Sequence, residues 1–583
     1  MGEAGHGARH WLDQYGKGYH AWARDGNGFY RPCGLVETRF DSDGRYFGGR
    51  ADVNALLTIG VSTRLSEKEL QYHIQLAFTL LRLRHCLLGA KAELRTLEVE
   101  PWFSVGIPAT VDAAIQDAGL AMRFMDKAVD GVSDAGDFYI HAQNVARIVK
   151  PSETLARVFV FPMEKAEGDT RRKLQFLFVM AHEITDGLSS MSWMADFTRI
   201  MNMPTKQIRQ SIERAILPES IQACLPPAQE DLYAPVAPTK ARERWFWAIT
   251  IVLRHVKKQM PPAFPNPLHR TTPFSKARPF APKYPNVLDY SETPPLNTFF
   301  VRFQLSPAAS QRLYRLCKEA KASIGAGGFV LVGLAMMAAH EARHPDEADD
   351  DAARRPFVGS FPLNPRPFFG ARGLLESVML AFNKGIVLPF LPSHLPLEAR
   401  FRLLARQATR QLAAFQKRDL RSSSSSSAAA DDDAMAHMGI NGAGRLLASN
   451  YIDGVEKLRS ILPLHLRGAV PPPQGAYEVP VWTVSSATCG VSSVGRVDWS
   501  TARFDLGADP GADGVIASVE GLQSGVRVRD TEFLVGTWSE DGVVTVGVSF
   551  DGNFIDEGNV QGWIETMKSL LEVADAPGLK AHL

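Results

Sequence analysis

Two spacings of apolar residues alternate along this chain and together predict a mixed α/β protein. Apolar side chains recur every three or four positions through residues 66–85, as in a helix with one buried face, and Ser66 with Glu69 forms a capping box at its start. Runs rich in Val and Phe at 157–163 and 173–181 predict two buried strands, and the polar residues between them predict a hairpin-like connection. Strand and helix patterns alternate in both halves, without a short-period repeat.

The pattern of apolar residues and prolines divides the 583 residues of the chain into three parts. Residues 1–203 predict an N-terminal α/β lobe. Prolines then recur through 204–297, too densely for a regular helix or a central strand, which predicts a long crossover with one helix embedded at 240–258. Residues 298–583 predict a second lobe, in which the Ser-, Ala- and Asp-rich stretch at 421–434 is expected to be a disordered surface insertion, because it cannot bury apolar surface.

The second lobe carries turn and cap signals of its own. Its first strand is followed by Ser306 as an N-cap and by Pro307 at the first helical position. Two apolar segments flank the sequence SEDG at 539–542, which predicts a hairpin, and apolar residues at helical spacing through 560–571 predict a closing helix. The predicted fold class is therefore α/β in both lobes.

The composition narrows the class of partner. Hydrophobic residues make up 45% of the chain and charged residues 22%, as in a soluble globular protein. The 64 basic and 63 acidic side chains leave a formal charge of +1, so no general attraction to nucleic acid is expected. The five cysteines are scattered, without a CxxC pair or a paired histidine spacing, which indicates reduced thiols in a cytoplasmic protein and no metal site.

No segment predicts stable insertion into a membrane. The N-terminus lacks an apolar signal core, and the longest apolar run, at 329–339, is far shorter than the ~20 residues that span a bilayer. The sequence RWFWAITIVLRHVKK at 244–258 combines aromatic and aliphatic bulk with bases, as interfacial helices do. We expect this segment to pack inside the protein, with an interfacial helix as the alternative.

The sequence HEITDG at 182–187 carries the strongest candidate chemistry. His182 stands at the end of a predicted buried strand and directly before a predicted helix, with Gly187 permitting a turn that side chains would crowd. A neutral imidazole there can accept a proton from an attacking hydroxyl, and Asp186 can hold the local geometry or orient the ring. The structural alternative is that Asp186 caps the helix beginning at Leu188 and that His182 is a core histidine.

Together His182, Asp186 and Gly187 resemble the HxxxDG signature of the CoA-dependent acyltransferase superfamily, which includes chloramphenicol acetyltransferase, the BAHD acyltransferases and the condensation domains of peptide synthetases. Other segments resemble the family in the same order: RPCGLVETRF at 31–40 as its opening strand region, LRLRHCLL at 81–88, the start of the second lobe at 305–339, and SSVGRVD at 492–498. The chain is similar in character to fungal secondary-metabolite O-acetyltransferases of the trichothecene 15-O-acetyltransferase type.

The resemblance implies two lobes like those of chloramphenicol acetyltransferase, with an active-site tunnel between them. His182 would deprotonate an acceptor hydroxyl, which attacks the thioester of acyl-CoA. Acetyl-CoA is the expected co-substrate, a hydroxylated secondary metabolite such as a terpenoid is the expected acceptor, and no cofactor is bound. Holding both substrates in one tunnel can contribute about 7–11 kcal/mol through orientation. A monomer is expected.

The resemblance also assigns structural roles near the motif. Asp186 would form an ion pair with an arginine, for which Arg84 is the matching candidate, although Arg84 could instead be a surface residue at a helix end. Gly187 would let the backbone pass close to the tunnel. Arg366 would order the strand near the tunnel or face solvent, and His85 is expected to be structural.

The oxyanion donor and the acyl donor are less well specified. Ser492, Ser493 or an amide beside Gly495 would stabilise the oxyanion, unless these small residues only fit a tight strand crossing. Ala181 replaces the first histidine of the HHxxxDG form, which argues against a peptide condensation domain, and VSFDGNFID at 548–556 stands in place of the DFGWG motif of plant BAHD enzymes. Two alternatives follow: an enzyme of condensation or polyketide-release type that uses a carrier-protein-bound acyl donor, and an inactive binding protein of the same fold.

Overall fold

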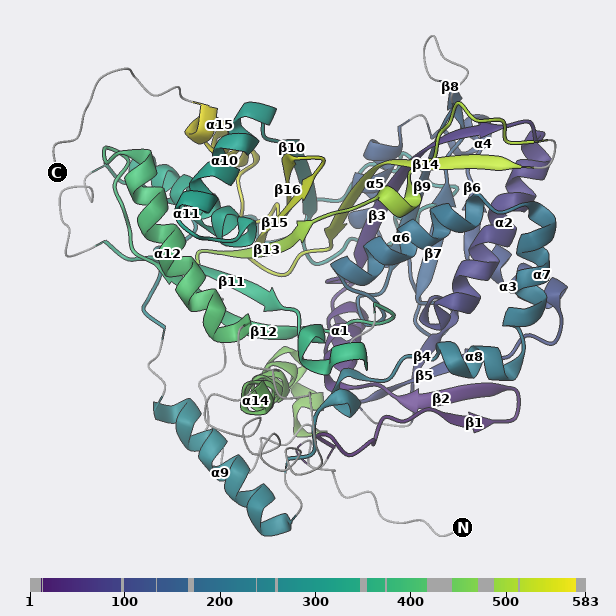
Figure 1. The fold of residues 1–583 in the computed structure, drawn as a ribbon, viewed down its shortest axis with the longest axis horizontal. Coiled ribbons are helices and arrows are strands. Elements are labelled where there is room, and N and C mark those ends of the chain that lie inside the picture. Colours follow the sequence, from purple (N-terminus) through teal and green to yellow (C-terminus); the bar gives the residue numbers. More distant parts are fainter. Residues whose placement is uncertain are drawn as a thin grey trace.

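The computed structural model describes residues 12–572 apart from 13, 96–98, 133, 166–171, 237–238, 257–259, 346–353, 373–374, 417–442, 470–486 and 512–513. In this part of the chain, helices and strands form two lobes that lie side by side, each built on a mixed six-stranded sheet (Figure 1). The α/β class predicted from the sequence is confirmed. The stretch at 421–434 lies outside the described residues.

The sheet of the N-terminal lobe has a buried central strand that leads to the HxxxDG motif. In spatial order its strands are β14 (Val515–Val526), β3 (Val53–Thr63), β9 (Arg172–Met180), β7 (Ala156–Val160) and β6 (Met122–Phe124), with β8 (Glu164–Lys165) also paired to β9. Strand β9 runs antiparallel to both β3 and β7. This pairing confirms the two buried strands and the hairpin-like connection expected at 157–181.

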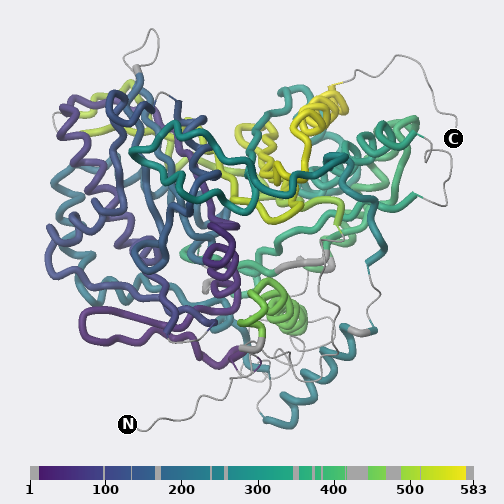
Figure 2. The backbone as a smooth tube through the Cα atoms, turned by 180° about the vertical axis from the view of Figure 1, so that it is seen from behind, coloured from purple at the N-terminus to yellow at the C-terminus, as the bar shows by residue number. Residues whose placement is uncertain are grey.

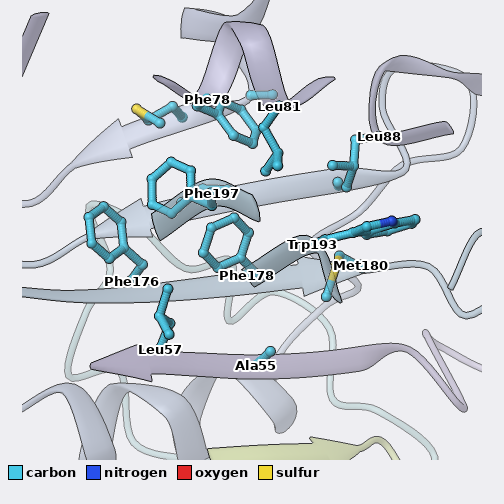
Figure 3. Packing of buried hydrophobic residues seen from close by; sticks show 14 of the residues in the cluster. Ala55, Leu57, Phe78, Leu81, Leu88, Phe176, Phe178, Met180, Trp193 and Phe197 are labelled. Carbon is cyan, nitrogen blue, oxygen red and sulfur yellow. The ribbon is translucent and has the colours of Figure 1, made fainter. Parts of the chain in front are cut away.

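Helices cover this sheet through aromatic packing. Phe197 packs edge-on against Phe176 and Phe178 of β9, with ring centroids 5.1 and 5.6 Å apart, and Trp193 is fully buried nearby (Figure 3). Such closely packed rings fix the helix that follows the motif against the strand that precedes it. The helices of this lobe are α2 (Glu67–Arg84), α3 (Val111–Leu120), α4 (Lys127–Asp130), α5 (Ala135–Gln143), α6 (Gly187–Met201), α7 (Thr205–Ala215) and α8 (Pro218–Cys224).

A small four-stranded sheet lies below this lobe in Figure 1. Its strands, in spatial order, are β1 (Ala23–Asp25), β2 (Gly28–Pro32), β5 (Pro101–Gly106) and β4 (Lys91–Leu94). Only the first residues of the segment 31–40 belong to it. The chain then enters α1 (Leu35–Tyr46), so the segment that resembles the family's opening strand region contains the end of a strand and the start of a helix.

The C-terminal lobe has its own six-stranded sheet. In spatial order the strands are β10 (Thr298–Gln304), β16 (Val543–Asp551), β15 (Phe533–Glu540), β13 (Cys489–Arg496), β11 (Phe357–Leu363) and β12 (Ala381–Leu388). The helices against it are α10 (Pro307–Glu319), α11 (Ile324–Arg343), α12 (Leu397–Gln416) and α15 (Glu557–Glu572). Among the described helices, α11 alone has the length and hydropathy of a membrane span, but 67% of its most apolar window is buried inside the lobe.

Strand β14 crosses from the second half of the chain into the sheet of the first lobe. It pairs antiparallel with β3 from Val515 opposite Thr63 to Val526 opposite Val53, with one register shift between Val519 and Gly521. Hydrophobic alternation assigns such a strand to a sheet face but cannot name its partner. The boundary predicted at 298 therefore does not separate the two sheets, because the N-terminal sheet is completed by residues of the C-terminal region.

The crossover and two further helices tie the lobes together. The chain from 260 to 297 runs across the back of both lobes (Figure 2), with Phe264 in the core of the C-terminal lobe and Tyr284 in the core of the N-terminal lobe. Helix α1 packs on α14 (Ala443–Ile461), and α9 (Lys240–Val256) also packs on α14. The helix expected at 240–258 is present as α9, described to Val256. The crossover expected from 204 begins later, because residues 205–224 form α7 and α8 of the N-terminal lobe.

Several local predictions are confirmed by the backbone. The amide of Glu69 donates to Ser66 Oγ at 3.4 Å, and that of Ala309 donates to Ser306 Oγ at 3.1 Å, so both predicted caps form. Strands β15 and β16 pair from Glu540 opposite Val543, and the two turn residues between them have positive φ, as a tight Asp-Gly hairpin requires.

Candidate active site

His182 lies where the central strand of the N-terminal lobe ends. Strand β9 ends at Met180, and the amide of Ala181 donates to the carbonyl of Leu155 at 2.9 Å. A short turn then leads to the start of α6 at Gly187. The histidine is therefore held by a buried strand on one side and a packed helix on the other.

An aromatic ring from α1 supports the imidazole. The rings of Phe40 and His182 are stacked, with centroids 3.8 Å apart and planes 6° apart. The Nδ1 atom of His182 is buried and has no hydrogen-bond partner among the described residues, whereas the residue as a whole is only half-buried. Because Nδ1 is closed off, Nε2 is the nitrogen that can meet a substrate.

The surroundings of His182 favour its neutral form. Burial is the main cause that lowers the pKa of His182 from 6.5 to about 4, and the charge of Arg529 lowers it further. The carboxylate of Asp186 and the backbone of Thr185 act in the opposite direction. At neutral pH the imidazole is therefore unprotonated, which is the state that a general base needs.

The positive charge near His182 comes from the loop between β14 and β15. The guanidinium carbon of Arg529 lies 5.8 Å from the centroid of the Phe40 ring. Its Nη2 donates to Asp43 Oδ2 at 2.8 Å, and Asp43 Oδ1 also accepts from Arg50 Nε at 2.8 Å. Neither Phe40 nor Arg529 was expected at the site: Phe40 ends the segment 31–40, and no local pattern marks Arg529.

Asp186 has two roles that use different oxygens. Oδ1 accepts from the amides of Leu188 at 3.0 Å and Ser189 at 2.9 Å, which caps α6. Oδ2 accepts from Arg366 Nη2 at 2.7 Å and from the amide of Met379 at 3.0 Å. The helix-cap alternative and the ion-pair expectation are thus both correct, and neither oxygen is used to bind the imidazole.

The arginine that pairs with Asp186 is Arg366, not Arg84. Arg366 is buried, and its Nη2 also donates to Ser189 Oγ at 2.9 Å and to the carbonyl of Ser377 at 2.7 Å. Arg366 begins the 3-10 helix η5 (Arg366–Arg372) of the C-terminal lobe, so the ion pair joins the lobes.

Arg84 forms a different and more exposed ion pair at the end of α2. Its Nη1 donates to Asp196 Oδ1 at 3.3 Å, and 39% of its side chain is exposed. Asp196 Oδ2 also bonds His85 Nε2 at 3.2 Å, and Glu376 bonds the other ring nitrogen of His85 at 2.5 Å. Arg84 and His85 therefore bind Asp196, in the second half of α6, and not the HxxxDG motif at its start.

Gly187 leaves open space at the first turn of α6. A Cβ built on it would meet no heavy atom within 4 Å, its φ is not positive, and the residue is exposed. The expected crowding of side chains at this turn is therefore wrong, since the described fold does not itself require glycine there. A side chain at position 187 would occupy the open space in front of α6, and glycine leaves that space free.

The proposed oxyanion residues lie on β13. Ser493 and Gly495 flank a register shift between β13 and β15, and Gly495 has a φ of +81°. Ser493 Oγ lies 3.2 Å from the position that a Cβ on Gly325 would take, at the first turn of α11, and Ser492 accepts a hydrogen bond from Thr537 Oγ1 through its carbonyl. The small residues therefore fit a close approach between β13 and the start of α11, and the oxyanion role of Ser492, Ser493 or Gly495 stays a prediction.

Glu183, next to the candidate base, is an acid enclosed by the fold. Its side chain is fully buried, and neither Oε1 nor Oε2 has a hydrogen-bond partner among the described residues. Burial raises its pKa well above 4.5, the charge of Asp41 raises it further, and Arg147 and Arg45 oppose the shift. Those arginines are bound to other acids, Arg147 to Asp52 and Arg45 to Asp41, so burial dominates and favours the protonated carboxyl.

The described residues offer little sign of a second reaction centre. No group of three or more His, Cys, Asp or Glu side chains among them could hold a metal ion. A cavity of about 410 Å³ opens on the N-terminal lobe beside Arg123, Arg147 and Arg157, and none of the motif residues 182–187 lines it. Each of these cations already has an acid partner, so we do not assign this cavity to the chemistry. The interlobe tunnel stays a prediction.

The exchanged strand and the position of His182 are the two main features of the described fold. A strand of the second half completes the first sheet, and a histidine ends the central strand of that sheet, before a helix capped by the motif aspartate. This two-lobe fold is shared with a solved acetyltransferase structure. A solved trichothecene 15-O-acetyltransferase from Fusarium sporotrichioides matches 95% of this chain and 97% of its own, with a TM-score of 0.61 and 12% identity.

Two other solved structures match at lower TM-scores. The first condensation domain of the calcium-dependent antibiotic synthetase is 13% identical, with 93% of this chain and 95% of that chain covered and a TM-score of 0.49. The epimerization domain from the third module of tyrocidine synthetase B is 11% identical, with coverages of 93% and 96% and a TM-score of 0.48. No protein-family model matches this chain, and no curated protein matches it by sequence.

Proposed function

We propose that this protein is an acyl-CoA-dependent O-acyltransferase that transfers an acyl group, in the simplest case acetyl, to a hydroxyl of a secondary metabolite such as a terpenoid. The observation that carries the proposal is the state of His182. It is neutral, it is stacked on Phe40, and its Nδ1 is closed off while the residue keeps accessible surface. Those are the properties of a positioned proton acceptor.

In the proposed reaction His182 Nε2 accepts the proton of the acceptor hydroxyl. The oxygen attacks the thioester carbonyl carbon, and the tetrahedral intermediate then expels the CoA thiolate, which takes the proton back from the imidazolium. No covalent bond to the protein forms. Orientation of the two substrates in one site can contribute about 7–11 kcal/mol.

The neighbouring residues have supporting roles in this proposal. Asp186 is a positioning residue, because it caps α6 and binds Arg366 and so fixes the turn that holds His182. The open space at Gly187 leaves room for a substrate in front of the α6 amides. Ser492, Ser493 and the backbone beside Gly495 are the proposed source of the oxyanion donor.

The first test is thermal unfolding of the full-length protein with CoA, acetyl-CoA and a longer acyl-CoA. A ligand at about 100 times its dissociation constant adds about 2.7 kcal/mol to the stability of the folded state. We expect an acyl-CoA ester to raise the midpoint in the wild type and equally in His182→Ala, because the imidazole acts on the acceptor and not on CoA.

The second test is release of free CoA from acetyl-CoA in the presence of a panel of hydroxylated terpenoids, with His182→Ala as the control. Turnover that depends on both the acceptor and His182 supports the proposal. Binding of CoA esters without turnover by any acceptor in the panel would favour an inactive binding protein. Failure to bind any CoA ester, together with acyl transfer from a phosphopantetheinylated carrier protein, would replace the CoA donor by a carrier-bound one.

A further inference from the structure

Helix α9, in the proline-rich crossover, is apolar on two opposite faces. Phe246 and Trp247 point inward and keep only 5% and 7% of their surface exposed. Trp245, Val252 and Val256 point outward and are 69%, 57% and 75% exposed. An apolar stripe on a helix of a globular protein normally packs against an apolar partner. In the part of the chain that the structure describes, nothing covers the apolar outer face of α9.

The inner face holds α9 firmly against the protein. Arg254 Nη2 donates to Glu456 Oε2 at 2.7 Å and to Asp453 Oδ1 at 2.5 Å, both on α14. Arg445 Nη1, also from α14, donates to the carbonyl of Phe246 at 3.2 Å and to Thr250 Oγ1 at 2.8 Å. With these bonds in place, α9 cannot rotate to bury its outer residues without losing two ion pairs that are themselves mostly shielded from water.

The outer residues form one continuous stripe. At about 100° per residue, the positions within roughly 60° of Trp245 on the helix surface are all apolar except one arginine. They are Ala241, Arg242, Trp245, Ala248, Ile249, Val252 and Val256. All of them are exposed except Ile249, which is half-buried. The stripe therefore runs the length of the helix.

The flank of the stripe is cationic. Lys240, Arg242 and Arg244 are exposed, and the acid of this turn, Glu243, is bound to Lys17 at 3.0 Å. Two more lysines, Lys257 and Lys258, follow the helix in the sequence. Helix α9 lies at the outer edge of the molecule, below the C-terminal lobe in Figure 1, and at the same edge when seen from behind in Figure 2.

We propose that the outer face of α9 binds the surface of an anionic lipid bilayer. Trp245, Val252 and Val256 enter the boundary between headgroups and acyl chains, while Arg242 and Arg244 contact the headgroup phosphates. Tryptophan, aliphatic residues and flanking bases on one helix face form the combination that this interface stabilises, because one medium satisfies both the apolar stripe and the cations. The contact is peripheral and leaves the fold unchanged, and it does not depend on the proposed acyl transfer.

The test is co-sedimentation of the full-length protein with vesicles of phosphatidylcholine alone and of phosphatidylcholine mixed with phosphatidylserine. We expect binding to the mixed vesicles that weakens with added salt, and little binding to phosphatidylcholine alone. The double variant Trp245→Gln, Val252→Gln should lower the partition coefficient by about tenfold or more. The matched control is Leu120→Gln, which removes a side chain of 75% exposure from α3, far along the chain, and should leave binding unchanged.

A second variant tests the charge separately from the apolar stripe. Arg242→Glu with Arg244→Glu should abolish the preference for phosphatidylserine, and thermal midpoints within a degree or two of the wild type would show that both variants fold. Equal binding by wild type and by either variant would overturn the proposal, as would the absence of wild-type binding to mixed vesicles. Loss of self-association in the double variant, with no vesicle binding by the wild type, would assign the face to a second copy of the chain and would equally overturn it.

Discussion

Two adjacent side chains, His182 and Glu183, share a turn but lie in different surroundings. Burial favours the uncharged form of each, because it lowers the pKa of the imidazole and raises the pKa of the carboxyl. The lowered pKa keeps the imidazole of His182 neutral, and the raised pKa favours the protonated carboxyl of Glu183. His182 could be predicted because its motif is local to six residues. Phe40, Arg529 and the enclosure of Glu183 could not, since each depends on contacts made by residues far away in the chain.

Replacing His182 by Gln should lower kcat by about 100- to 10,000-fold, because proton acceptance is lost.

The same change alters how stability depends on pH. The pKa of His182 is about 4 in the folded state, below its ordinary 6.5, so the unfolded chain takes up the proton first as pH falls. Stability is therefore complete above about pH 6.5 and declines toward pH 4, by about 1–2 kcal/mol between pH 7 and pH 5 for this residue.

Urea unfolding of wild type and His182→Gln at both pH values measures this difference. The variant should lose less stability than the wild type on going from pH 7 to pH 5. Parallel losses in the two proteins would show that the folded imidazole keeps an ordinary pKa.

Glu183→Gln should stabilise the protein at alkaline pH. The raised pKa of Glu183 means that its stabilising effect is complete below about pH 4.3, the value for an unfolded glutamate, and is lost as pH rises toward the folded value. A buried amide of the same shape has no proton to lose, so the variant should gain about 1–3 kcal/mol over wild type at pH 8 and nothing near pH 4.5. Guanidinium unfolding at the two pH values measures the gain, with the exposed Glu213→Gln as the control. A destabilised variant at pH 8 would mean that the carboxyl is ionised.

Among the helices and strands, the start of α6 shows where prediction from sequence ends. The cap by Asp186, the capping box of α2 and the Asp-Gly turn between β15 and β16 involve residues within a few positions of one another, and all of them could be read from the sequence. The ion pair of Asp186 required a choice between Arg84 and Arg366, which lie on opposite sides of it in the sequence. Only the packing of the lobes decides between them, and it selects Arg366.

Arg366→Met should cost about 3–5 kcal/mol of stability, since it leaves the Asp186 carboxylate buried without its cation. Arg84→Met is the matched control. Its ion pair is partly exposed and should be worth less than about 1 kcal/mol. Chemical unfolding of the two variants measures the difference, and kcat should fall with Arg366→Met only, because the turn that holds His182 is disturbed. Similar costs for both variants would contradict the assignment.

For the whole molecule, we expect the two lobes to unfold as one unit, because strand β14 and the Asp186–Arg366 ion pair join them. Unfolding the C-terminal region removes β14 and exposes the edge of β3 along its length. Calorimetry of the full chain should therefore show one cooperative transition, in which the calorimetric and van't Hoff enthalpies agree. Two resolved transitions in the wild type would show that the lobes unfold independently. A transition whose midpoint is the same in Arg366→Met as in the wild type would show the same.

The pairing of β14 with β3 also has a consequence for biosynthesis. Strand β3 leaves the ribosome early, but its partner is made more than about 400 residues later, which at 5–20 residues per second is roughly 20–90 seconds of translation. During that interval one edge of a strand that is mostly buried in the folded protein has no native neighbour. The newly made first half of this protein is thus a natural client for chaperones that shield strand edges, and faster translation of the second half would shorten the time in which it can aggregate.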